Sequence, residues 1–200
     1  MPVDFESATQ VRIALIRHGP SAHAHPGWID SAGFREWRES YEAAGIRESE
    51  PAPAHLQRLM AGAAAVLTSD APRAVQSAAL LAPDRQVIVS PLLRELELLA
   101  PRLGPLSLPL PLWALAVGAR SLMLTLRSRY PAPAEMARVE HAAAWLGQLA
   151  ATTGPLAVVT HASFRSLLTK RLIQGGWQLE RTRRSLGHWS VWSVSTGRCR

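Results

Sequence analysis

Short apolar runs alternate with longer amphipathic segments along this chain. Ile13–Ile16 and Leu156–Val159 are continuous apolar runs that lead directly into polar residues. A run this short, followed by a turn signal, is typical of a strand buried on both faces of a parallel sheet. Strands separated by helices predict an α/β fold of three layers, a doubly wound, mostly parallel sheet with helices on both faces. We expect strands over residues 11–17, 65–68, 86–89, 156–160 and 188–194, and helices over 34–44, 54–64, 134–151 and 164–173, with a further helix near Pro72.

Two of the predicted helices carry signals at their ends. Phe34, Trp37 and Tyr41 recur at helical spacing with charged residues between them, and Gly45 ends that segment. Asp70 is a good N-cap, and Pro72 suits the first turn of a helix. The first helix is therefore expected to be amphipathic, and the second to start directly after a strand.

Residues 101–131 break this alternation. Pro101–Pro111 is too rich in proline for a regular helix or a central strand. Leu112–Leu126 is strongly apolar, with an interruption at Arg120. We expect one domain over residues 1–200, in which 101–131 is a cap or an inserted segment.

The apolar stretch Leu106–Leu126 approaches a membrane span in length and hydropathy. Pro109, Pro111 and Arg120 oppose that interpretation, because prolines and a charge are costly inside a bilayer-spanning helix. We therefore expect an apolar cap or core helix and no membrane partner. Because exposed apolar area usually has a use, a homodimer through this stretch is a further hypothesis.

Composition bounds the class of protein. Two hundred residues with 48% hydrophobic and 18% charged side chains are typical of a globular domain rather than a disordered chain. A formal net charge of +7 favours anionic partners such as phosphorylated metabolites, nucleic acid or acidic membranes. The single cysteine, Cys199, excludes an intrachain disulfide and a cysteine metal cluster. Residues 1–10 are polar and lack the apolar segment of a secretory signal, so we expect a cytoplasmic protein.

Candidate chemistry lies where the two apolar runs end. Arg17 and His18 follow the first run, and His161 follows the second. Ligands of open α/β sheets bind at the carboxyl ends of such strands. Two histidines at two strand ends, with arginine nearby, suggest a site for an anionic group.

Four segments resemble, in order, the motifs of the histidine phosphatase superfamily, the phosphoglycerate-mutase-like fold. They are Arg17–Gly19, Thr68–Ala78, Leu93–Glu95 and Val158–Ala162. The resemblance implies a metal-independent phosphatase without a cofactor. It would hydrolyse a phosphorylated small molecule, phosphohistidine or a phosphoprotein through a phosphohistidine intermediate.

The resemblance also implies roles for individual residues. His18 would be the nucleophile, and His161 would contribute to catalysis and contact the phosphate. Arg17 and Arg73 would hold the phosphate oxygens, because a guanidinium offers paired donors that match them. Ser21 could supply a hydroxyl contact to the same phosphate.

The same resemblance makes Glu95 the general acid. It would protonate the leaving oxygen and later take a proton from the attacking water. Leu96 and Glu97 stand where many relatives continue to a glycine-containing motif, so Glu97 is the reserve candidate.

The chain departs from the usual motifs around both histidines. Thr160 and Ala162 flank the second histidine, where relatives commonly have glycines. Ala24 stands where an asparagine that touches phosphate is expected, and His23 or His25 could replace it. These two histidines lack further ligands at matching spacing, so no metal site is expected.

The remaining aromatic and basic residues are weighed individually. Trp28 is the tryptophan best placed for substrate contact, whereas His55, His141 and His188 are expected to be ordinary surface or core residues. A basic cluster of Arg181, Arg183 and Arg184 lies close in sequence to Trp177 and Trp189, but it matches no nucleic-acid-binding motif. We therefore expect a solvated loop there and no nucleic-acid partner.

Two other functions remain open. A phosphoglycerate-mutase-like phosphotransferase would use the same site and keep the phosphate on His18. A catalytically weak regulatory module would bind a phosphorylated ligand without turnover, and the departures at Ala24, Thr160 and Ala162 motivate it.

Overall fold

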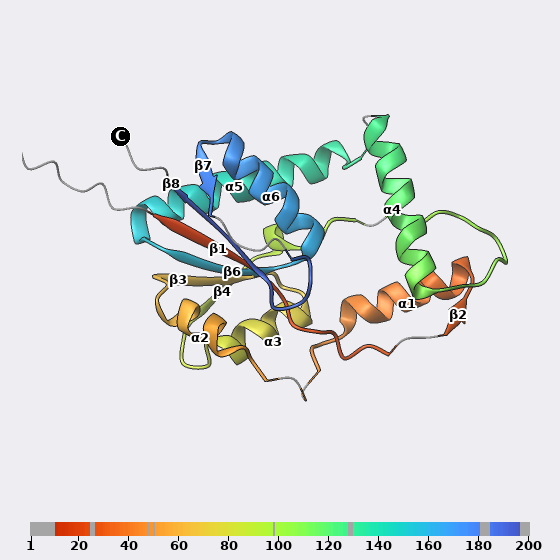
Figure 1. Cartoon of the computed structure of the whole chain (residues 1–200), viewed down its shortest axis with the longest axis horizontal. Helices are drawn as coiled ribbons and strands as arrows, with labels where there is room; N and C mark the ends of the chain where they lie inside the picture. Colours follow the sequence, from red (N-terminus) through yellow and green to blue (C-terminus); the bar gives the residue numbers. More distant parts are fainter. Residues whose placement is uncertain are drawn as a thin grey trace, which may run out of the picture.

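A six-stranded sheet forms the centre of the fold (Figure 1). The computed structural model describes residues 11–24, 27–47, 49, 51–97, 99–127, 130–180 and 185–196. The strand order is β4-β3-β6-β1-β8-β7, in which β1 is Arg12–Arg17, β3 Ala65–Thr68, β4 Val87–Val89, β6 Leu156–Thr160, β7 Trp177–Leu179 and β8 Val191–Thr196. Strands β4, β3, β6 and β1 pair in parallel, and β8 and β7 extend the sheet in antiparallel pairing. The mostly parallel sheet that the alternation predicts is confirmed.

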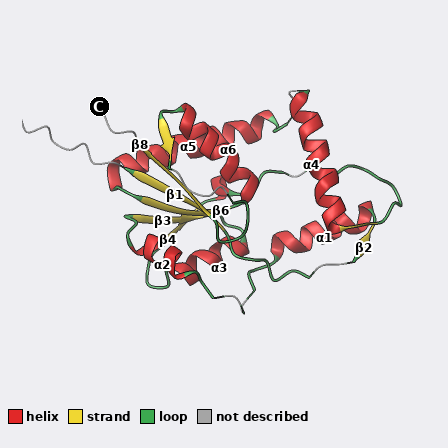
Figure 2. Cartoon of the chain, in the orientation of Figure 1, coloured by secondary structure: helices red, strands yellow, loops and turns green. Residues whose placement is uncertain are grey.

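Helices cover both faces of this sheet (Figure 2). The helices are α1 (Ser31–Ala43), α2 (Ala54–Ala61), α3 (Pro72–Leu81), α4 (Leu110–Leu126), α5 (Pro133–Thr153) and α6 (Ala162–Gln174), with a 3₁₀ turn at Pro91–Leu93. Helices α5 and α6 pack against one face around Leu146 and Leu168, and α2 and α3 pack against the other around Leu56 and Ala78. The predicted three layers are therefore present.

The central strand β6 is apolar throughout because helices cover both of its faces. Leu156 and Val158 belong to the core under α5 and α6, whereas Ala157 and Val159 belong to the core under α2 and α3. All four side chains are at most 1% exposed. A strand covered on both faces has no polar side, so a continuous apolar run replaces the alternation of a half-exposed strand.

Helices α1 and α4 lie beside the sheet, at the right of Figure 1, and pack on each other. The rings of Phe34 and Trp113 stack with centroids 4.5 Å apart, and the Trp113 indole donates to the Ile29 carbonyl at 2.9 Å. A short ladder of β2 (Trp28–Ile29) and β5 (Leu108–Pro109) closes the same unit. We call α1, α4 and this ladder the cap.

Helix α4 contains most of the apolar stretch that resembles a membrane span. It buries Trp113 and Val117, but Leu115 and Leu126 are 68% and 79% exposed. Within the described ranges, no helix combines the length and apolarity that crossing a membrane requires.

Several predicted boundaries are wrong, each for a local reason. Helix α1 starts at Ser31, not at residue 34, because the Asp30 side chain accepts from the Gly33 amide. Asp70 does not cap α3, because it pairs with Arg94 at 2.7 Å and leaves Ala71 as an N-cap without a side-chain bond.

The last predicted strand is also displaced. It runs over Val191–Thr196 rather than 188–194, because Trp189 has a φ of 58°, which is incompatible with an extended strand. The three-residue strand β7 was not predicted, and neither were the two-residue strands β2 and β5. Runs this short carry too little pattern to be recognised.

The stacked pair in the cap predicts a large effect on stability. We expect Trp113→Ala to lower the free energy of unfolding by about 3–5 kcal/mol, because it removes a fully buried ring and its hydrogen bond. Leu115→Ala, on the exposed side of the same helix, should change it by less than about 0.5 kcal/mol. Urea unfolding followed by tryptophan fluorescence and circular dichroism measures both, and equal losses would contradict the packing described.

Candidate active site

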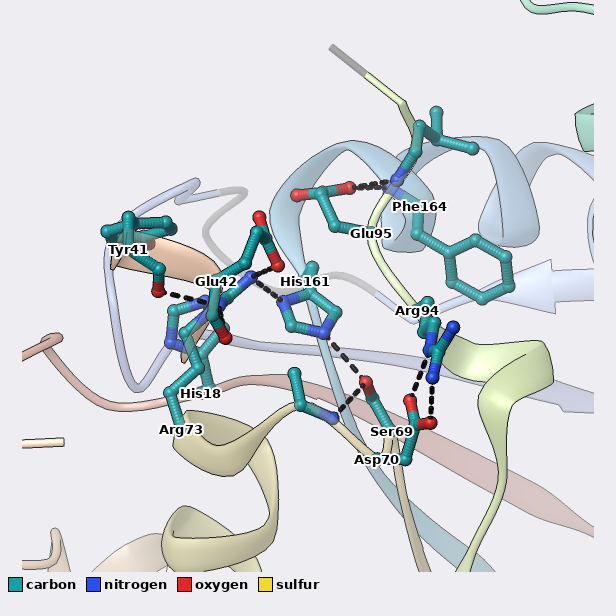
Figure 3. A network of polar contacts seen from close by, with 12 residues as sticks. His18, Tyr41, Glu42, Ser69, Asp70, Arg73, Arg94, Glu95, His161 and Phe164 are labelled. Atoms are coloured by element: carbon teal, nitrogen blue, oxygen red, sulfur yellow. Dashed lines mark hydrogen bonds and ion pairs between the residues drawn. The ribbon is translucent and has the colours of Figure 1, made fainter. Parts of the chain in front are cut away.

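Parallel pairing of β1 with β6 brings the two motif histidines together. Arg17 pairs with Thr160 in register, and the His18 amide donates to the Thr160 carbonyl at 3.0 Å. His18 and His161 follow at the same edge of the sheet, with ring centroids 5.0 Å apart. Figure 3 shows this centre, with Arg73 and Glu42 beside the two rings.

His18 is held as a neutral ring with one free nitrogen. The side chain is 2% exposed, and Nδ1 lies 2.7 Å from the Gly19 carbonyl oxygen. A carbonyl only accepts, so Nδ1 carries the proton and Nε2 keeps its lone pair. Burial, then the nearby Arg73 and Arg17 charges, lower the pKa of His18 to about 3. The ring is therefore neutral over the physiological pH range.

The glycine after His18 is required by packing. A Cβ on Gly19 would lie 2.3 Å from the Trp189 ring, much closer than van der Waals contact allows. The Gly19 amide also donates to the Ser77 hydroxyl at 2.9 Å, which ties this turn to α3. Only a residue without a side chain lets Trp189 cover the turn that carries His18.

His161 is also neutral, and it has the opposite tautomer. Its Nδ1 lies 3.5 Å from Nη2 of Arg73, which can only donate, so Nε2 carries the proton and donates to Ser69 Oγ at 2.9 Å. Burial first, and then His18 and the nearby arginines, hold the pKa of His161 well below its usual value. In this state His161 accepts from Arg73 rather than donating to an anion.

Arg73 projects from α3 into the centre and is closed off by the last turn of α1. Its guanidinium donates to the Tyr41 and Glu42 carbonyls at 3.2 and 3.4 Å and to the Glu42 carboxylate at 3.0 Å. It also lies 4.6 Å from the centroid of the Tyr41 ring. The Arg73 side chain is 1% exposed, and within the described part of the chain its Nε has no hydrogen-bond partner. The Glu42 carboxylate therefore occupies the donors that a phosphate would use.

Arg17 lies at the end of β1. One Nη donates to the Leu186 carbonyl, whereas the buried Nε has no hydrogen-bond partner among the described residues. Burial is the largest influence on Arg17 and lowers its pKa, while Tyr41 and Glu95 favour its charged form. The structure thus brings Arg17, Arg73, His18 and His161 into one cluster.

Glu95 reaches the same edge of the sheet from the opposite side. Its carboxylate accepts from the Phe164 amide at 2.8 Å and from the Ser163 amide at 3.3 Å, so it caps the N-terminus of α6. Burial raises the pKa of Glu95, although its backbone hydrogen bonds act in the other direction. A carboxyl with a raised pKa is suited to holding a proton near neutral pH. Glu97 is exposed and has no such contacts among those described.

Arg138 fixes the segment that carries Glu95. Its guanidinium donates to the carbonyls of Leu92, Arg94 and Glu95 at 3.0, 2.8 and 3.1 Å. It also lies 4.8 Å from the centroid of the Phe164 ring. Glu95 therefore sits on a braced backbone rather than on a free loop.

Two cavities flank the centre, and the last turn of α1 lies between them. The larger, of about 680 Å³, is lined by Glu42 and Glu95, and the smaller, of about 360 Å³, is lined by Arg17, Ser21 and Tyr41. Both motif histidines are buried, with 2% and 1% of their surface exposed.

Of the other predicted site residues, some line the smaller cavity, one lies in the cap, and some lie outside the described residues. Ser21 and His23 line the smaller cavity, where the Ser21 hydroxyl accepts from the His23 amide at 3.2 Å. Ala24 lines it as well and supplies no polar side chain. Trp28 lies in β2, in the cap, and is 71% exposed. His25, Cys199 and the basic cluster of Arg181, Arg183 and Arg184 lie outside the described residues.

Sequence reasoning missed three groups at the centre. His188, expected to be an ordinary residue, has its ring 5.5 Å from that of His18, and burial followed by Arg17 and Arg47 lowers its pKa to about 4. Tyr41 and Glu42 were assigned only to a helix. The helical spacing of Tyr41 was the one available signal, and it did not show what the helix end contacts.

The loop that carries His188 is held by a buried arginine. Arg165 of α6 is fully buried and donates to the Ser190 and Ser185 carbonyls at 2.6 and 2.9 Å. Burial, then the Arg17 charge, lower the pKa of Arg165 to about 10. Within the described ranges, no group of three or more His, Cys, Asp or Glu side chains could hold a metal ion.

Comparisons with known proteins support a phosphatase fold. No protein-family model and no curated protein matches the chain. A structure assigned as an alpha-ribazole-5′-P phosphatase of Escherichia coli is 25% identical, with a TM-score of 0.51 over 82% of this chain and 80% of that one. A mycobacterial glucosyl-3-phosphoglycerate phosphatase is 19% identical, with a TM-score of 0.54 over 82% and 80% of the two chains. A phosphoserine phosphatase of Entamoeba histolytica is 15% identical, with a TM-score of 0.55 over 91% and 89%.

Fold and site together define an α/β protein with a buried two-histidine centre at the carboxyl ends of its parallel strands. The resemblance that the four motifs predicted is confirmed: the chain shares the fold of the histidine phosphatase superfamily.

The contact between Glu42 and Arg73 predicts stronger anion binding when it is removed. Glu42→Gln takes away the charge that occupies Arg73, so we expect inorganic phosphate to bind about fivefold more tightly. Glu39→Gln removes the same charge one turn earlier in α1 and is the matched control. Isothermal titration at low salt measures both dissociation constants, and equal affinities in the two variants would rule out a competing role for Glu42.

A depressed histidine pKa predicts that stability falls in acid. The folded chain keeps His18 neutral down to a pKa of about 3, whereas the ordinary value of 6.5 applies after unfolding. Between those values the unfolded chain binds more protons, so the free energy of unfolding decreases as the pH falls from 6.5 toward 3. We expect His18→Asn to reduce that decrease by about 1 kcal/mol per pH unit.

Urea unfolding at closely spaced pH values measures this slope. His55→Asn, which removes an exposed histidine, is the control. The same change of slope in both variants would contradict the assignment to the buried ring.

Proposed function

We propose that this chain is a metal-independent phosphatase that hydrolyses a phosphorylated small molecule through a phosphohistidine on His18. The observation that carries the proposal is the state of His18, a buried neutral ring with Nδ1 bonded to the Gly19 carbonyl and a lone pair on Nε2. Arg17 and Arg73 beside it can neutralise a phosphoryl group. The similar structure assigned as an alpha-ribazole-5′-P phosphatase supports the same class of reaction.

In the first step, the substrate phosphate replaces the Glu42 carboxylate on Arg73. The His18 Nε2 lone pair forms a bond to phosphorus while the bond from phosphorus to the ester oxygen breaks. Glu95, whose pKa burial raises, acts as the general acid and gives a proton to the leaving oxygen. The alcohol leaves, and the phosphoryl group stays on His18.

In the second step, water attacks the phosphorus of phospho-His18. The Glu95 carboxylate takes a proton from that water, the nitrogen–phosphorus bond breaks, and inorganic phosphate and neutral His18 are restored. Once Arg73 turns to the phosphate, the proton of His161 can shift from Nε2 to Nδ1 and be donated to a phosphoryl oxygen, while the Ser69 hydroxyl donates to Nε2. Glu97 remains the alternative proton carrier, because it lines the larger cavity together with Glu95.

One observation favours a second candidate, a regulatory module that binds a phosphorylated ligand without turnover. In this structure, Arg73 is held by Glu42, and the Glu95 carboxylate is bonded to the α6 amides. Such a module would bind phosphate but form no phosphohistidine. A phosphotransferase of the mutase type would form the intermediate and lose it slowly to water. The activity is proposed for the cytoplasm, in line with a single cysteine among 200 residues.

The proposal predicts a specific loss of activity. In 4-nitrophenyl phosphate hydrolysis with EDTA present, we expect His18→Ala to lower kcat/KM by at least about 10³-fold, because it removes the nucleophile. His55→Ala, at an exposed histidine, is the control and should retain activity. Equal activity in all three proteins would exclude His18 as the nucleophile.

Trapping the intermediate separates the candidates. A hydrolase gives an acid-labile, base-stable phosphoenzyme that turns over within each cycle, and a mutase gives one that persists. No hydrolysis and no phosphoenzyme, with phosphate still raising the melting temperature, would replace the proposal with the binding module.

A further inference from the structure

Helix α4 of the cap (Figure 1) is apolar on two opposite sides. Trp113 and Val117 lie on the side that packs on α1 around Phe34. At about 100° per residue, a second apolar row lies on the side opposite to them. This row, which we name the outer row, consists of Leu112, Leu115, Ala119, Leu122 and Leu126, and every member is exposed. A helix that is hydrophobic all round is normally buried all round, but within the described part of the chain only one side of α4 is covered.

The outer row has the spacing of a contact between two helices. Its members follow one another at intervals of three, four, three and four residues, which is the repeat that keeps one side of a helix against a partner helix. Leu115, Leu122 and Leu126 are 68%, 61% and 79% exposed. With Leu112 and Met123, they make five of the twelve large apolar side chains that are exposed among the described residues. Exposed apolar area concentrated on one helix marks an interaction surface.

The outer row is symmetric about its middle residue, Ala119. Leu112 and Leu126 lie seven residues before and after it, and Leu115 and Leu122 lie four before and three after. A two-fold axis at Ala119 would place Leu112 of one copy opposite Leu126 of the other, and Leu115 opposite Leu122. An interface between two identical copies requires this kind of self-complementarity, whereas an interface with an unrelated partner does not.

The charges around α4 favour two copies in antiparallel orientation. Arg120, the only charged residue within the helix, is half-buried, and the exposed Arg127 follows the last residue of the helix. A parallel pair would set the two copies of Arg127 side by side, whereas an antiparallel pair separates them by about 24 Å along the helix axes. The chain has a formal net charge of +7, so two copies repel each other, and the uncharged outer row offers a surface where they can meet.

The same helix is poorly suited to a lipid bilayer. A helix that lies in a membrane interface has lysine or arginine along a polar face. Helix α4 contains no lysine, and the side opposite to the outer row is packed on α1. Beside Ala119, a Cβ on Gly118 would meet no atom within 4 Å, so a second helix can approach closely at the middle of the row.

We propose that two copies of this chain associate through the outer rows of their α4 helices, antiparallel and related by a two-fold axis at Ala119. This association goes beyond the proposed function and does not depend on it. A helix of 17 residues is about 25 Å long, so the contact is smaller than that of a permanent dimer. We therefore expect a reversible dimer with a dissociation constant between about 10 and 100 µM.

Sedimentation velocity between about 1 and 300 µM of the full chain measures this association. The native chain should shift with concentration from its monomer mass of 21.8 kDa toward twice that mass. Leu115→Glu and Leu122→Glu each place a charge in the outer row and should raise the dissociation constant at least about tenfold. Ile173→Glu, at a side chain of α6 that is 42% exposed, is the matched control and should leave it unchanged. The substituted side chains are all exposed, and circular dichroism verifies that each variant is folded.

Cysteine crosslinking tests the orientation of the two helices. Cys199→Ser first removes the single native cysteine. In that background, Ala119→Cys should form a disulfide between two copies under mild oxidation, because the two-fold axis brings these positions together. Leu126→Cys should not, because an antiparallel pair separates its two copies by about 21 Å. Crosslinking of both variants, or of neither, overturns the antiparallel arrangement.

The remaining outcomes separate the second copy from other partners. A native chain that stays monomeric at the highest concentration, or a dimer that Leu115→Glu and Leu122→Glu leave intact, overturns the proposal. Flotation with vesicles of phosphatidylcholine and phosphatidylglycerol tests the bilayer directly. A monomeric native chain that floats with these vesicles, and that Leu115→Glu releases from them, replaces the second copy with a membrane. Hydrolysis of 4-nitrophenyl phosphate is measured separately, so a failure of this proposal is distinguishable from a failure of the proposed function.

Discussion

Parallel pairing between β1 and β6 is the constraint on which the rest of the site depends. The register that sets Arg17 opposite Thr160 also determines that His18 and His161 leave the sheet at the same level. A shift of one residue would send one of these histidines to the opposite face, because side chains alternate along a strand. The apolar residues of both strands are buried under helices on both faces, so the core fixes the register and the register fixes the chemistry.

Two buried arginines near this edge show how differently a charge can be accommodated. Arg165 is surrounded by carbonyls of Ser185 and Ser190, which cannot leave without unfolding the loop. Arg73 has carbonyls and one carboxylate, that of Glu42, whose side chain is 52% exposed. A partner that is half in water can return to water at little cost, so it can be exchanged for another anion. Arg165 therefore serves the structure, whereas Arg73 is arranged to change partners.

The sequence predicts the part of the site that strands position. Each of the two apolar runs predicts a strand, and the residues directly after it, Arg17 and His18 or His161, predict the site. The same short segment therefore predicts both the strand and the polar residues at its end. Asp70 shows where local reasoning fails, because the Arg94 guanidinium competes with the helix amides for its carboxylate. The contact of Glu42 with Arg73 joins residues 31 positions apart, so the hydrophobic periodicity of the sequence does not predict it.

The position of His188 beside His18 could not be predicted either, because it also depends on contacts between distant residues. It lies in a loop outside regular structure, and its place beside His18 depends on Arg165 and on the turn at Trp189. Residues 101–131 were recognised as an unusual segment, but the packing of α4 on α1 rests on contacts between distant residues, such as the stacking of Trp113 on Phe34. Such tertiary contacts follow from the packing of whole elements rather than from the pattern within one of them.

Helix α1 has Phe34 on its cap side and Glu42 at its other end, eight residues or about 12 Å further along. A helix of this length moves as a rigid rod, so releasing Arg73 by shifting the helix also displaces the ring that rests on Trp113. A shift of α1 that releases Arg73 is thereby coupled to the packing of α1 on α4 at the other end of the helix. In the proposed phosphatase, a cycle limited by this displacement would slow as solvent viscosity rises, and the exposed leucines of α4 would then affect its rate.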